Sequence, residues 1–233
     1  MATPGSDTDK PLETSITTIV KDSGALDLAA DAAEQALDTF LTEGPLKEIP
    51  IFKYFLTVWR AAPQIRDLLL AKKIAKFLKP LRDIPKTERE EFIHRLEKEP
   101  EFQRDVGAHL LLVIDRLDNM SKPQLLAGAF RAYIESTISW QQFQDLAVVV
   151  DRCVVGDLVH LKEAARPASF PPAVASRLAG CGVIEIAVIP AIRGAEAVNQ
   201  YLLTDLGELI VALGLNRAAE QVTGAALFQS TRS

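Results

Sequence analysis

Residues 45–83 read PLKEIPIFKYFLTVWRAAPQIRDLLLAKKIAKFLKPLRD, the most aromatic and most basic part of the chain. Over residues 51–60 apolar side chains cover more than half of a helix, and Pro63 is expected to kink or restart it. Over residues 64–83 the pattern becomes amphipathic, with lysines opposite an apolar stripe. That stripe consists of Leu70, Ile74, Phe77, Leu78 and Leu81. We therefore expect two successive helical segments around which the other helices pack.

This basic segment belongs to an acidic protein, because residues 53–82 hold eight Lys and Arg residues and one Asp while the whole chain carries −5. This local excess of basic residues predicts a surface for a protein partner or a membrane. The proposed members are three aromatic residues and four lysines: Phe52, Phe55, Trp59, Lys72, Lys73, Lys76 and Lys79. Three interpretations stay open: a solvated face that meets acidic neighbours, a surface for anionic membrane or an acidic partner helix, and a nucleic-acid surface. Because the aromatic half would have to leave the core, we expect membrane binding only after a trigger.

The composition bounds the fold class and the compartment. The chain has 233 residues, of which 48% are hydrophobic and only 6% aromatic, and this favours helices around a sizeable core. Cys153 and Cys181 lack any metal-ligand spacing, and the N-terminus lacks an apolar signal core. We therefore expect free thiols and a cytoplasmic location.

The pattern after residue 166 changes from helical to mixed. Pro167, Pro171 and Pro172 interrupt the helices, and VIEIAVI at residues 183–189 alternates like a strand. Residues 199–203 are expected to form the returning strand, and Thr204 is expected to cap a last helix, which ends at Gly214. The predicted fold is mainly α: a multi-helix bundle with a small C-terminal helix–β-hairpin–helix (winged-helix-like) appendix. Its parts are a disordered tail at 1–10, a helical domain at 11–166, the appendix at 167–215 and a weakly ordered tail at 216–233.

Local signals place several helix ends and contacts within the helical domain. Thr87 with Glu90 predicts a capping box, and Ser139 predicts another cap. The run HLLLVIDRL at residues 109–117 is heavily apolar and is expected to be central. Asp115-Arg116 and Asp151-Arg152 are expected to form ion pairs that link helices.

The chain carries no sequence motif for a P-loop, a nucleophile elbow or a zinc helix. We therefore expect no catalytic, cofactor-binding or metal-binding residues, no cofactor, no small-molecule substrate and no enzyme activity. Winged folds suggest DNA binding, for which Arg177 and Arg193 are the candidate contacts. We do not expect nucleic-acid binding, because residues 167–233 hold about four basic residues and a duplex reader uses several.

Four short motifs carry a resemblance. They are GPLKEIPI at residues 44–51, FRAYI at 130–134, ISWQQF at 138–143 and LTDLG at 203–207. In this order they resemble a broad family of uncharacterised bacterial helical proteins, over about residues 12–215. The resemblance implies a bacterial, cytoplasmic protein in which these motifs serve packing and capping, and it implies no activity.

These observations favour a non-enzymatic helical protein that acts through protein–protein interaction, with self-association as one form of it. Two alternatives stay open. One is a switchable membrane-surface effector that uses the basic aromatic helix at residues 50–83. The other is a DNA-binding regulator that uses the C-terminal appendix.

Overall fold

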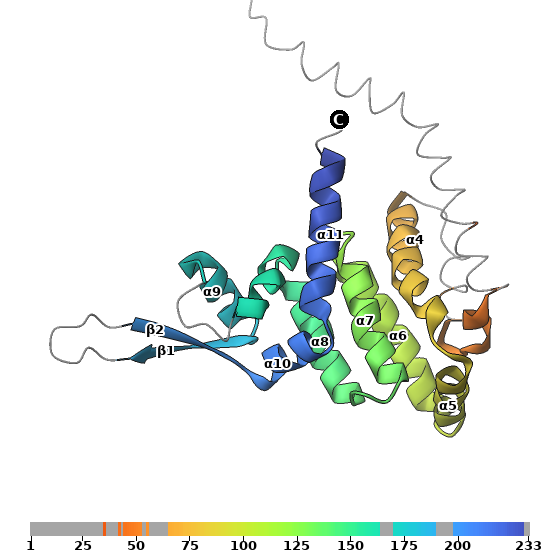
Figure 1. Ribbon diagram of the computed structural model, residues 1–233. Helices are drawn as coiled ribbons and strands as arrows, with labels where there is room; N and C mark the ends of the chain where they lie inside the picture. The colour runs from red at the N-terminus through yellow and green to blue at the C-terminus, as the bar shows by residue number, and fades with distance from the viewer. Residues whose placement is uncertain are drawn as a thin grey trace, which may run out of the picture.

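The computed structural model describes residues 35, 42, 44–52, 55, 65–163, 170–189 and 198–230, and it is mainly helical with one two-stranded antiparallel sheet (Figure 1). The helices before the sheet are η2 (Pro45–Glu48), α4 (Ile65–Leu78), η3 (Lys79–Asp83), α5 (Lys86–Glu97), α6 (Pro100–Arg116), α7 (Lys122–Ile134), α8 (Trp140–Arg152), η4 (Val155–Glu163) and α9 (Pro172–Gly180). The sheet is formed by β1 (Ile184–Ile189) and β2 (Val198–Leu203), and α10 (Asp205–Ala212) and α11 (Leu215–Ser230) follow it. The predicted fold class, a helical body with a helix–hairpin–helix appendix, is confirmed.

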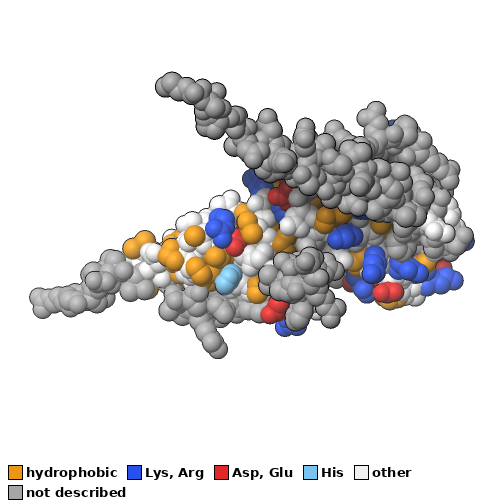
Figure 2. All heavy atoms as spheres, turned by 90° about the horizontal axis from the view of Figure 1, so that it is seen from above, with side chains coloured by type: hydrophobic (Ala, Val, Ile, Leu, Met, Phe, Trp, Pro, Cys, Tyr) orange, Lys and Arg blue, Asp and Glu red, His pale blue; other side chains and the backbone are white. Residues whose placement is uncertain are grey.

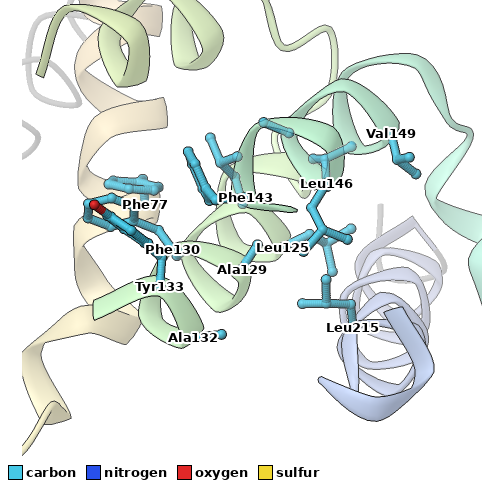
Figure 3. Close-up of a cluster of buried hydrophobic side chains, with 14 of the residues drawn as sticks. Phe77, Leu125, Ala129, Phe130, Ala132, Tyr133, Phe143, Leu146, Val149 and Leu215 are labelled. Carbon is cyan, nitrogen blue, oxygen red and sulfur yellow. The ribbon is translucent and has the colours of Figure 1, made fainter. Parts of the chain in front are cut away.

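Helix α7 lies at the centre of the core. Ten of its thirteen residues are buried, and it packs against α4, α5, α8 and α11. The Phe130 ring lies 5.7 Å from the Phe77 ring and 5.3 Å from the Phe143 ring, centroid to centroid, and Figure 3 shows these rings meeting beside α7. Aromatic pairs of this kind contribute about 0.5–1.5 kcal/mol beyond their burial. The expectation that residues 109–117 are central is wrong in part, because Leu112 of α6 is 64% exposed.

The basic segment packs as its apolar pattern predicted. Ile74, Phe77 and Leu78 of α4 are buried, as is Leu81 of η3, while Leu70 is partly buried against the same core. In the GPLKEIPI motif the apolar side chains are also fully buried: Leu46, Ile49 and Ile51. The predicted kink at Pro63 lies outside the described residues. This segment therefore supplies one wall of the core around α7.

Two of the three predicted caps are confirmed. The Ser139 hydroxyl accepts a hydrogen bond from the Gln142 backbone amide, and the Ser139 backbone amide donates one to the Gln142 side-chain oxygen, so ISWQQF begins α8 with a capping box. Thr204 caps α10 in the same manner, through the Gly207 amide. The capping box at Thr87 is wrong, because α5 begins directly after Pro85 and Thr87 already lies inside its first turn. A side chain inside the helix cannot occupy the capping position.

The C-terminal end of the described chain is helical. Residues 215–230 form α11, which packs against η4 and α7 and buries Leu215, Asn216 and Ala219. A Cβ atom at Gly128 of α7 would lie 2.8 Å from Leu215 Cδ2, so the absence of a side chain there lets α11 approach closely.

Candidate protein interface

The predicted basic surface divides into lysines that hold the fold together and lysines that face solvent. Lys73 Nζ donates a hydrogen bond of 2.7 Å to the Asp115 carbonyl in the last turn of α6. Lys76 Nζ donates one of 3.1 Å to the Met120 carbonyl in the loop that follows. A cation at a helix C-terminus satisfies a free carbonyl and opposes the negative end of the helix dipole.

The same arrangement recurs at the next two helix ends. Arg95 of α5 donates to the Tyr133 and Ile134 carbonyls at the end of α7, at 3.3 and 2.7 Å. Lys122, only 2% exposed, donates a hydrogen bond of 2.7 Å to the Asp151 carbonyl at the end of α8. Arg116 then joins α6 to the Asp151 carboxylate at 2.9 Å, the interhelical ion pair that the sequence predicted. Many basic side chains therefore serve the packing of successive helices.

The remaining members of the predicted surface are not gathered on one exposed face. Phe52 and Phe55 are buried, with their ring centroids 5.4 Å apart, and Trp59 lies outside the described residues. Lys72 is half-buried and Lys79 is exposed, and neither makes an ion pair with another described residue. Figure 2 shows Lys and Arg side chains at the end of the molecule that holds α4 and α5. The aromatic and basic halves are thus separated into core and surface.

Of the two candidate nucleic-acid contacts, Arg177 and Arg193, the structure describes only Arg177. Arg177 of α9 forms a bidentate ion pair with Asp157 of η4, through hydrogen bonds of 2.6 and 2.8 Å. That carboxylate is buried, and its hydrogen bond is the main cause of the raised pKa of Arg177. Arg193 lies outside the described residues. Arg177 therefore has a structural partner that binds η4 to α9.

The hairpin is the most apolar exposed feature of the described chain. Eight large apolar side chains are exposed in the described residues, and half of them lie on its two six-residue strands. They are Ile186, Val188, Ile189 and Leu202, with exposed fractions of 40%, 64%, 47% and 43%. Figure 1 shows the hairpin projecting away from the helices, and Figure 2 shows hydrophobic side chains gathered toward that end. Clusters of exposed apolar side chains are typical of contact surfaces.

The strand register shows which backbone groups of the hairpin are unpaired. Ile184 pairs with Leu203 and Ile189 pairs with Val198. Because the Thr204 amide donates to the Val183 carbonyl, Val183 and Thr204 form a hydrogen-bonded pair, and such pairs alternate along the ladder. Ile186 and Val188 therefore direct their backbone N–H and C=O groups outward, and no other described backbone group binds them. An open strand edge of this kind is a template for another strand.

The base of the hairpin is held firmly to the helices. The Thr204 hydroxyl donates to the Gly182 carbonyl at 2.7 Å while it caps α10. A Cβ atom at Gly207 would overlap the Val183 carbonyl oxygen, so this position of the LTDLG motif requires glycine. On β2, Tyr201 is buried against Phe170, with ring centroids 5.2 Å apart. The exposed part of the hairpin thus extends from a rigid base.

Two hollows also open on the described surface. One, of about 600 Å³, lies between the α5–α6 and α7–α8 turns, with Phe102, Tyr133 and Trp140 in its wall. Ser136 in its lining has a φ of 58°, an uncommon left-handed conformation for a residue with a side chain. The other, of about 410 Å³, lies between α8 and α10 and includes Cys181. The wall of the first hollow mixes cationic, anionic and hydroxyl side chains, and so it selects no single ligand chemistry.

Comparison with protein-family models, with curated proteins and with solved structures found no match. Among the described helices, none combines the length and the apolar character needed to cross a bilayer. The four motifs that carry the resemblance have local roles here. GPLKEIPI and FRAYI supply buried side chains, and ISWQQF and LTDLG supply helix caps.

Proposed function

We propose that this protein is a non-enzymatic, cytoplasmic interaction protein whose helical body presents the β1–β2 hairpin to another polypeptide. The observation that carries the proposal is the combination of exposed apolar side chains and an open backbone edge on β1. An added strand would satisfy the outward N–H and C=O groups and would shield the neighbouring side chains at the same time.

The distribution of apolar side chains favours edge pairing over docking of one flat face. Ile186 and Val188 lie on one face of the hairpin, whereas Ile189 and Leu202 lie on the other. A surface laid flat against the hairpin would cover only one of these pairs. A strand added at the edge places side chains beside both faces. The proposed contact is therefore β-strand addition.

The rigid base supports the same function. The Thr204 and Gly207 contacts fix the direction in which the hairpin leaves the helices, so a partner strand meets an edge that is already ordered. Ordering before binding reduces the entropy that association costs. The proposal does not extend to a membrane, because Phe52 and Phe55 are buried in the core.

Photo-cross-linking in cells that express the full-length protein tests this function. A photoreactive amino acid at Val188, on the exposed strand, is expected to form adducts whose cross-linked peptide mass spectrometry identifies. The matched control is Leu112 of α6, which is also 64% exposed but lies on a helix. An Ile186→Lys change beside the probe should remove the Val188 adducts, because an edge lysine opposes strand addition. Equal labelling at Val188 and Leu112, or no adduct at Val188, would overturn the proposal.

A further inference from the structure

The open edge of β1 offers a way for two copies of this chain to pair with each other. A strand that pairs antiparallel with its own copy obeys a two-fold axis, the commonest symmetry of protein dimers. Because only alternate residues of β1 face outward, hydrogen-bonded pairs must join the outward residues Ile184, Ile186 and Val188 of the two copies. This leaves five registers within the strand, centred on each residue from Ile184 to Val188.

Four of these registers are less favourable than the fifth. Centring on Ile184, Glu185 or Ile186 would place an outward residue of the second copy beside Ile184, which is 2% exposed at the hairpin base near α9. Centring on Val188 leaves a single hydrogen-bonded pair within β1, which joins Val188 to its own copy. Centring on Ala187 does not use Ile184 and forms two hydrogen-bonded pairs within β1. Each Ile186 then exchanges two backbone hydrogen bonds with Val188 of the other copy.

In the Ala187 register the side chains of the two copies also fit one another. The two copies of Ala187, the smallest residue of β1, face each other at a non-hydrogen-bonded position, where Cα atoms approach to about 4.5 Å. Ile186 meets Val188 on one face, and Ile189 meets the aliphatic part of Glu185 on the other. All three of the exposed large apolar residues of β1 are then shielded.

Charge does not oppose this pairing. Glu185 is the only charged residue in the two strands, IEIAVI and VNQYLL. In the Ala187 register the two Glu185 positions lie roughly 14 Å apart along the sheet. That distance exceeds the screening length of about 10 Å at 0.1 M salt. The projection of the hairpin holds the two acidic bodies apart as well (Figure 1).

Resting on the proposed function, we infer that the occupant of the β1 edge is a second copy of this chain, paired antiparallel across a two-fold axis at Ala187. The result is a four-stranded sheet in the order β2–β1–β1–β2. The interface is small, so the dimer dissociates readily, with a Kd on the order of 10–100 μM. Salt leaves this Kd nearly unchanged, because the contact contains no ion pair.

Disulfide trapping in the full-length protein tests the register. Cys181→Ser first removes the half-buried thiol, while Cys153 is buried and its pKa is raised to about 12, so it remains unreactive. In that background Ala187→Cys is expected to form an intermolecular disulfide at least about tenfold faster than Val188→Cys. Two Val188 Cα atoms would lie roughly 8 Å apart, beyond disulfide reach. Random collision predicts the reverse order, because Val188 is the more exposed residue. Equal rates, faster trapping at Val188, or no trapping would overturn the inference.

Light scattering at increasing protein concentration tests the dimer itself. We expect a monomer–dimer equilibrium that Val188→Lys weakens by about tenfold or more, while Leu112→Lys changes it by less than about twofold. Both sites are exposed, so circular dichroism should show unchanged helix content. A wild-type protein that stays monomeric throughout overturns the inference. If Val188 still cross-links another protein in cells, the proposed function stands without self-association.

Discussion

Replacing Gly207 with Ala should destabilise the appendix, because the new methyl group would overlap the Val183 carbonyl oxygen. A backbone oxygen cannot move aside by changing rotamer, so the start of β1 must separate from α10. That separation strains the 2.7 Å bond from Thr204 to the Gly182 carbonyl and the 3.1 Å cap at the Gly207 amide. Overpacking costs about 1–3 kcal/mol, and a lost cap costs about 0.5–2 kcal/mol. The gain in helix propensity, about 1 kcal/mol, offsets part of this.

The expected net loss is about 0.5–4 kcal/mol of unfolding free energy, measured by urea denaturation with circular dichroism. Gly180→Ala is the matched control, because Gly180 ends α9 and a Cβ atom there would meet nothing within 4 Å. That variant should match the wild type or exceed its stability by up to about 1 kcal/mol. For a chain of this length each kcal/mol of stability corresponds to roughly 2–4 °C in Tm, so Gly207→Ala should have the lower Tm of the two variants. Equal stability of the two variants would refute the explanation of the LTDLG motif.

Two further predictions concern buried or partly buried polar groups. Lys73→Met should lower the free energy of unfolding by about 1–3 kcal/mol, because it removes the side chain that caps α6. Lys79→Met, at an exposed site, should change the free energy of unfolding by less than about 0.5 kcal/mol. Chemical denaturation of both variants checks this, and equal effects would contradict it. His109 has a buried Nε2 without a hydrogen-bond partner and packs 5.4 Å from the Trp140 ring, and burial lowers its pKa from 6.5. The unfolded chain therefore binds the proton more readily, so His109 makes stability fall as pH drops below about 6.5 and level off below the folded pKa. His109→Phe should reduce this loss of stability at low pH and raise the free energy of unfolding by about 1 kcal/mol. Denaturation at about pH 8 and about pH 5.5 measures both effects, and an unchanged pH profile would argue against the explanation.

The elements that the sequence predicted well depend on local patterns. The stripe of α4 follows the helical period, and the caps at Ser139 and Thr204 need only a neighbouring amide three residues on. The strands of the hairpin follow the alternation of residues 183–189. These features require no knowledge of where distant parts of the chain lie.

The central position of α7 and the packing of α11 against it were harder to predict, because both depend on small residues. Ala129 and Ala132 are small residues that are buried in α7, and Gly128 lets Leu215 of α11 approach the same helix. The longer apolar run of α6 instead leaves Leu112 in solvent. Close approach depends on tertiary packing, which apolar content alone does not reveal.

The candidate interface was only partly predictable. The basic charge of residues 53–82 pointed to a binding surface, but the carbonyls that Lys73 and Lys76 cap lie more than forty positions away. The hairpin was predicted as structure and was not recognised as a contact site. The sequence did carry a signal for a contact site, because the apolar residues Ile186 and Ile189 fall on opposite faces of the strand. A strand with one solvated face would carry polar residues there.

Residue-resolved amide hydrogen exchange by NMR on the full-length protein tests most directly whether the edge of β1 is the contact element. In dilute solution the inward amides of Glu185, Ala187 and Ile189 should be protected, and the outward amides of Ile186 and Val188 should exchange freely. As the concentration rises through the expected Kd, protection should appear at Ile186 and Val188 while amides elsewhere keep their rates. Exchange at these two amides that stays fast at every concentration would contradict the account.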